Sequence, residues 1–72
     1  MTPFESPVDG DVTEWIVDDG SIVEKDQQLL RVEVMKILYE VLAPCAGKVK
    51  FEAAPGDFVG QGQTLGYILE DY

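Results

Sequence analysis

The chain repeats itself, and this repeat constrains its fold more than any other feature. Two sets of residues occur twice in the chain: the first set recurs 37 positions later and the second set 36 positions later. The offset changes between Val12 and Gly20, where a loop can vary in length. Val32 and Ile68 continue the second set conservatively. The chain therefore consists of two similar halves joined near Met35 and Lys36. The first set is Pro7, Gly10 and Val12, returning as Pro44, Gly47 and Val49; the second is Gly20, Val23, Gln27 and Leu29, returning as Gly56, Val59, Gln63 and Leu65.

Both halves consist of short apolar runs that end at turn residues. The runs are rich in Val, Ile, Leu and aromatic residues, and none keeps a helical period over about ten positions. Pro and Gly mark the predicted turns at residues 7–10, 18–20, 44–47 and 55–57. The predicted strands are residues 2–6, 11–17, 22–23, 28–34, 38–42, 47–51, 58–59 and 64–69.

Two similar all-β halves cover each other's apolar faces most economically as a β-sandwich or flattened barrel with approximate two-fold symmetry. A chain of 72 residues has room for one small core, so we expect a single domain over residues 1–72. The residues predicted to fill that core are Val12, Val23, Leu29, Val32, Val49, Val59, Leu65 and Ile68.

Composition argues against several functions. The chain has no histidine and one cysteine, Cys45, so a catalytic triad and the usual zinc sites are excluded, and we expect no catalytic and no metal-binding residues. A formal net charge of −9 disfavours binding to nucleic acids and to anionic membranes. An apolar run of about 18 residues is absent, and residues 1–5 lack the pattern of a signal peptide, so we expect a cytoplasmic location.

The junction between the halves has the pattern of a β-hairpin with an unusual loop. Two-residue hairpin loops prefer Asn-Gly, Asp-Gly or a leading Gly, because their backbone needs positive φ. The pair Met35-Lys36 matches none of these preferred sequences, whereas the other predicted turns contain Gly or Pro. Local sequence that breaks the rules of its fold often marks a functional site. The expected pairs are Val34–Ile37, Val32–Tyr39 and Leu30–Val41 on one face, and Glu33–Leu38, Arg31–Glu40 and Leu29–Leu42 on the other.

Around this loop the sequence resembles the biotinyl domains of biotin-dependent carboxylases. Residues 33–37, Glu-Val-Met-Lys-Ile, are similar to the Glu-Ala-Met-Lys-Met signature of that family. Ala43-Pro44 and Gly47 match the elements that follow the signature, as do Gly-Asp-Phe-Val at residues 56–59 and Gly-Gln-Thr-Leu at residues 62–65. The resemblance extends from about Pro7 to Leu69.

The resemblance implies a flattened β-barrel of two four-stranded antiparallel sheets, with Lys36 exposed on a hairpin. It implies that a biotin protein ligase attaches biotin covalently to Lys36, with Glu33, Val34, Met35 and Ile37 contributing to recognition of the tip. It further implies a monomeric biotin carboxyl carrier that moves a carboxyl group between a biotin carboxylase and a carboxyltransferase, and that is not itself an enzyme.

Two residues depart from the family's pattern, and two other functions are compatible with the same fold. Val34 stands where the family usually has Ala, and Ile37 where many members have Met, which affects the expected recognition by partners. The first alternative is a lipoyl domain, which has the same fold but typically carries Asp-Lys-Ala at its tip. The second is a structural module of this fold that carries no acyl group.

Overall fold

The structure is a computed structural model that describes residues 1–70, so the last two residues of the predicted domain, 71–72, lie outside it. The described chain contains no helix, and therefore none long and apolar enough to cross a membrane. The all-β prediction is confirmed, with two four-stranded antiparallel sheets. The strands are β1 (Thr2–Glu5), β2 (Gly10–Trp15), β3 (Ile22–Val23), β4 (Gln28–Val34), β5 (Ile37–Leu42), β6 (Gly47–Phe51), β7 (Phe58–Val59) and β8 (Thr64–Leu69).

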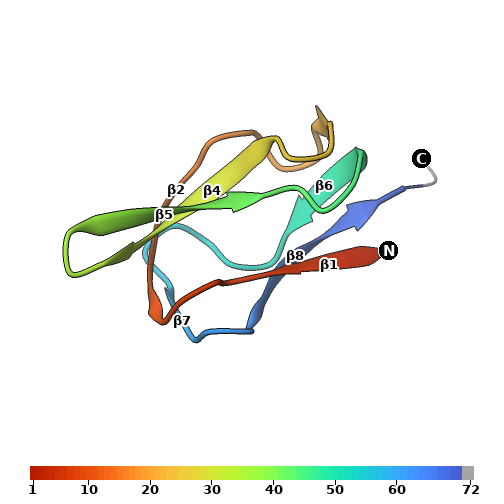
Figure 1. Ribbon diagram of the computed structural model, residues 1–72. Helices are drawn as coiled ribbons and strands as arrows, with labels where there is room; N and C mark the ends of the chain where they lie inside the picture. The colour runs from red at the N-terminus through yellow and green to blue at the C-terminus, as the bar shows by residue number, and fades with distance from the viewer. Residues whose placement is uncertain (71–72) are drawn as a thin grey trace.

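The two halves of the chain interleave, because each sends alternate strands to alternate sheets (Figure 1). One sheet has the order β5-β4-β2-β7 and contains the β4–β5 hairpin, so we call it the hairpin sheet. The other has the order β1-β8-β6-β3 and holds both terminal strands, so we call it the terminal sheet. Each half thus contributes two strands to each sheet, and the halves share one interior.

The interior lies between the two sheets and contains all eight residues predicted from the repeat. Each of the eight is at most 1% exposed, and Leu30 joins them as a fully buried side chain. An aromatic cluster crosses this interior: Phe51 stacks on Trp15 with ring centroids 4.5 Å apart and meets Phe4 edge-on at 5.9 Å. Trp15 comes from the first half and Phe51 from the second, so the cluster joins the halves.

The predicted strand bounds differ from the observed ones at only a few ends. Strand β1 ends at Glu5 because Ser6 has already turned, its hydroxyl donating to the Val8 carbonyl oxygen at 2.5 Å. Strand β2 runs from Gly10 to Trp15, so it ends two residues earlier than predicted, and β5 begins one residue earlier, at Ile37. The remaining five strands have the predicted bounds.

The repeated glutamines close equivalent turns. The side-chain oxygen of Gln27 accepts the backbone N–H of Glu24 at 2.9 Å, and that of Gln63 accepts the N–H of Gly60 at 3.0 Å. The first of these turns, at residues 24–27, is not one of the predicted turns and contains neither Gly nor Pro. Asp26 supplies its positive φ of 69° instead, because aspartate tolerates the left-handed region better than most side chains.

Two repeated glycines allow equivalent close contacts between strands. A Cβ atom on Gly10 would lie 2.4 Å from the carbonyl oxygen of Glu33, and one on Gly47 would lie 2.5 Å from that of Leu69. Both distances are well below van der Waals contact, and each involves backbone that is fixed by strand pairing. The repeat therefore keeps glycine at both positions because β2 must pack closely on β4, and β6 on β8.

Candidate functional site

The β4–β5 hairpin projects from one end of the molecule, away from the start of β1 and the end of β8 (Figure 1). Its two turn residues, Met35 and Lys36, both have positive φ, at 48° and 70°. Positive φ at both central residues defines a type I′ turn, whose twist matches that of the flanking strands. A non-glycine residue in this region costs about 1–2 kcal/mol. The tip therefore has the backbone that a tight hairpin requires but not the residues that normally adopt it.

The register of this hairpin agrees with five of the six predicted pairs. Val34 faces Ile37, and the pairing continues in step as far as Leu30 and Val41. The sixth prediction, Leu29 opposite Leu42, was wrong: a bulge between Gln28 and Leu30 places Gln28 opposite Leu42. The bulge allows both Leu29 and Leu30 to be fully buried, which strict alternation along the strand would prevent.

The predicted site residues lie together at this tip but differ in exposure. Met35 is 90% exposed and Ile37 is 57% exposed, and Lys36 is also exposed. Val34 is half-buried, because it turns back toward Gly10, while Glu33 is exposed on the outer face of the sheet. Within residues 1–70 the one ion pair joins Arg31 to Glu14, so the Lys36 ammonium is not held by a carboxylate.

The strand that leads away from the tip is more exposed than its apolar sequence indicates. Leu38 is 50% exposed, Tyr39 37% and Leu42 45%, whereas Val41 is buried. The sequence pattern favours a packing role for Tyr39 and does not mark the two leucines as surface residues. The signal that could have found them is their position: β5 is an edge strand of its sheet, and residues 38 and 42 lie opposite its buried side.

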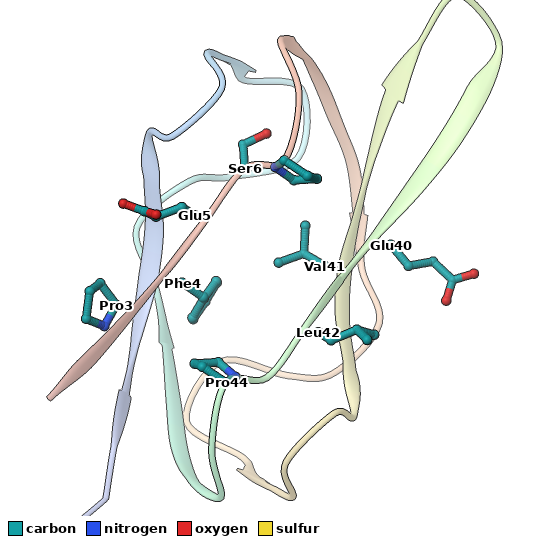
Figure 2. A pocket seen from close by; sticks show the side chains of 9 residues that line it. Pro3, Phe4, Glu5, Ser6, Glu40, Val41, Leu42 and Pro44 are labelled. Atoms are coloured by element: carbon teal, nitrogen blue, oxygen red, sulfur yellow. The ribbon is translucent and has the colours of Figure 1, made fainter.

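A groove of about 370 Å³ runs between the edge strands β1 and β5 (Figure 2). Its walls include Phe4, Val41, Leu42 and Pro44, and the carboxylates of Glu5 and Glu40 extend outward on either side in the figure. Ser6 also lines the groove, but the residue is 2% exposed and its hydroxyl donates to the Val8 carbonyl oxygen. Lys36 is not among the lining residues, so this groove is separate from the tip.

Cys45 is half-buried and packs against the core. Burial and a hydrogen bond to Glu70, with the Sγ–Oε1 distance at 3.2 Å, raise the pKa of the Cys45 thiol. A thiol with a raised pKa is a poor nucleophile at neutral pH. Within residues 1–70 no group of three or more acidic or cysteine side chains is arranged to hold a metal ion. At the tip, the exposed Lys36 provides an accessible primary amine.

Comparison with curated proteins finds relatives in two classes of multi-enzyme system. The chain is 34% identical over 67 residues to the dihydrolipoyllysine-residue succinyltransferase component of the 2-oxoglutarate dehydrogenase complex of Rickettsia felis, covering 92% of this chain and 17% of that protein. It is 36% identical over 56 residues to the acetyl-CoA carboxylase of Dictyostelium discoideum, covering 78% of this chain and 2% of that protein. The chain thus matches a small part of each relative.

Comparison with solved structures gives the same two classes. The chain superposes on the urea carboxylase of Kluyveromyces lactis with a TM-score of 0.86 and 26% identity, over 93% of this chain and 6% of that one. It superposes on the lipoyl domain of the 2-oxoglutarate dehydrogenase complex of Azotobacter vinelandii with a TM-score of 0.71 and 33% identity, over 88% of this chain and 81% of that one. A family model described as "biotin-requiring enzyme" matches residues 2–68. The chain therefore belongs to the biotin/lipoyl attachment family.

Proposed function

We propose that this chain is a biotin carboxyl carrier domain and that biotin is attached to the ε-amine of Lys36. The observation that carries the proposal is the tip itself. A primary amine lies at the end of a projecting hairpin. Both residues of its two-residue turn have positive φ, yet neither is glycine. Backbone strain that the rest of the fold must support is expected where function needs those particular side chains.

The tip geometry suits acylation by another protein. The uncharged amine of Lys36 attacks the acyl carbon of biotinyl-adenylate, an amide bond forms, AMP leaves, and the amine gives up a proton. The amine must enter the active site of a ligase, and an exposed hairpin tip allows this without any local unfolding. The type I′ turn also restricts the directions from which the amine can approach, which lowers the entropy lost on reaching the reactive geometry.

The same geometry suits a carrier rather than a catalyst. When bound, biotin supplies a ureido nitrogen that accepts and releases a carboxyl group. The protein contributes position: the hairpin is held by pairing along its whole length, so Lys36 is presented on a firm support. Tethering raises the effective concentration of the carried group at each enzyme that it visits. The partners in this proposal are a biotin protein ligase, a biotin carboxylase and a carboxyltransferase, with a monomeric carrier in the cytoplasm.

The residues around Lys36 support biotin over lipoate. Met35 precedes the lysine as in the biotinyl signature, and Ile37 follows it, where lipoyl domains typically have Asp and Ala. The superposition with the urea carboxylase, at a TM-score of 0.86, points in the same direction. Lipoylation is the second candidate, and it is favoured by the 34% identity with the Rickettsia felis succinyltransferase component.

The test is the intact mass of the folded chain after incubation with biotin, ATP and a purified biotin protein ligase. We expect the mass to increase by one biotinyl group, and we expect no increase for Lys36→Arg, which keeps the charge but removes the acceptor amine. A parallel reaction with lipoate, ATP and a lipoate ligase separates the two candidates. No gain with biotin but one lipoyl group on Lys36 would replace the proposed function with the second candidate.

A further inference from the structure

Four exposed side chains form a row across the outer face of the hairpin sheet, next to the tip. Strand register places Phe58 of β7, Asp11 of β2, Glu33 of β4 and Leu38 of β5 side by side. Phe58 is 70% exposed and Leu38 50% exposed, and both carboxylates are exposed. We call these four residues the tip row. Glu33 and Leu38 flank the turn that carries Lys36, so a protein that covers the row lies next to that turn.

The charges beside the tip row leave it negative. Arg31, the basic residue of β4, donates to Glu14 at 2.8 Å and faces Glu40 across the strand pair. Its charge is therefore already matched and does not offset Asp11 and Glu33. Leu42, 45% exposed, lies on the same side of β5 as Leu38, with Glu40 between them. The outer face thus presents carboxylates between two exposed apolar borders.

The internal repeat provides a control for what the fold itself requires. Applying the offsets of the repeat, the position of Asp11 corresponds to Lys48, that of Glu33 to Leu69, and that of Phe58 to Ile22. These three residues also form a row, on the outer face of the terminal sheet, through the pairs Ile22–Lys48 and Lys48–Leu69. The same backbone arrangement therefore carries a lysine at its centre in one sheet and two carboxylates in the other. The negative charge of the tip row is not a requirement of the fold.

We propose that the tip row is the docking face for the enzyme that acylates Lys36, and that the facing surface of that enzyme is basic with apolar recesses on either side. The proposal rests on the proposed function, since it concerns how the same amine is recognised. Exposed apolar side chains bordered by polar ones are typical of protein interfaces. Opposite charge on the partner increases the rate of encounter and orients the two proteins, an effect that salt weakens. The row lies where such orientation brings the amine to the partner's active site.

The first test reverses the charge of the row. Asp11→Lys with Glu33→Lys raises the formal net charge from −9 to −5, and Asp18→Lys with Glu24→Lys, around β3 and away from the tip (Figure 1), makes the same change as a matched control. The measurement is kcat/KM for biotin transfer by a purified biotin protein ligase, followed by intact mass. At low salt we expect about a tenfold loss or more for the tip-row variant, a smaller loss at high salt, and little change for the control.

The second test removes the apolar border. Phe58→Ser should raise KM several-fold at every salt concentration while leaving kcat nearly unchanged, because it removes a contact rather than a charge. Equal kcat/KM for the tip-row variant and the unaltered chain would overturn the proposal, as would an equal loss in the control. Absence of any transfer to the unaltered, folded chain is a different result, because it contradicts the proposed function itself.

Discussion

The two ends of the molecule are equivalent under the internal repeat, yet they differ in connection and in exposure. At one end β4 pairs with β5 and a strained turn joins them; at the other, β8 pairs with β1 and the described chain begins and ends. Equivalent strand pairs also distribute side-chain volume differently. Leu30 faces Val41 at the hairpin end, whereas at the terminal end the small Gly66 faces the large Phe4. The repeat therefore preserves strand pairing and filled volume, and leaves turns and outer faces free to diverge.

Equivalent leucines in the two halves test whether the two ends share one core. Leu29→Ala and Leu65→Ala remove equivalent, fully buried side chains. Each should lower the free energy of unfolding by about 2–5 kcal/mol, because each leaves a cavity between the sheets. Chemical denaturation of the two variants measures this. A large loss at one position and almost none at the other would break the equivalence.

The repeated glycines test the same equivalence through two close contacts between strands. Gly10→Ala and Gly47→Ala both place a Cβ atom against a backbone carbonyl oxygen, at 2.4 Å and 2.5 Å. We expect each to cost about 1–3 kcal/mol, since the strands must move apart to accept the methyl group. Thermal unfolding gives the two losses side by side. Gly56→Ala is not a suitable control because its φ of 95° adds strain, so Lys25→Ala, at an exposed turn position, serves as the control.

The tip turn has no counterpart at the terminal end, and changing it should separate stability from function. Met35→Asn should stabilise the chain by about 0.5–1 kcal/mol, because asparagine tolerates positive φ better than methionine. The same variant, and Met35→Ala beside it, should slow either biotin transfer or carboxylation. Denaturation and transfer rates are measured on the same preparations. Unaltered rates in both steps for both variants would remove Met35 from the recognised surface.

At the terminal end, in the place where the hairpin end has a turn, the Thr2 hydroxyl donates a hydrogen bond to the Glu70 carboxylate. Hydrogen bonds from Thr2 and Cys45 lower the pKa of the Glu70 carboxyl. The unfolded chain then binds more protons than the folded one between the two pKa values. The stabilisation is therefore complete above the unfolded pKa and is lost as the pH falls through the folded pKa. In an NMR titration Thr2→Val should move the Glu70 pKa upward, and an unchanged value would exclude the Thr2 contact as its cause.

Sequence alone predicted most of the fold, because the two-fold repeat and the period of the apolar residues act at every position. It located the eight core residues and nearly all of the hairpin register. It could not place the bulge at Leu29, because the bulge arises from the need to bury two adjacent leucines. It also missed the turn closed by Gln27, although the repeat with Gln63 contains the signal.

The site divides in a similar way. The amino-acid sequence by itself indicates Met35 and Lys36, since their conflict with the residue preferences of hairpin turns is visible there. The tip row was not predicted, because its members come from four strands and only strand register brings them together. The choice between biotin and lipoate depends on contacts that a ligase makes with the tip, and the same amine serves for either acyl group.

The interleaving of the halves has a consequence for the chain cut in two. A peptide ending before Met35 would hold strands of both sheets but could complete neither, since β2 needs β7 and β3 needs β6 from the other half. Neither fragment should fold alone, and a mixture of the two should fold only as a heterodimer whose stability rises with concentration. By the same reasoning, a half-length peptide with the repeat pattern should be stable only when two copies pair. The present chain therefore has the architecture of such a dimer with its two copies joined in one polypeptide.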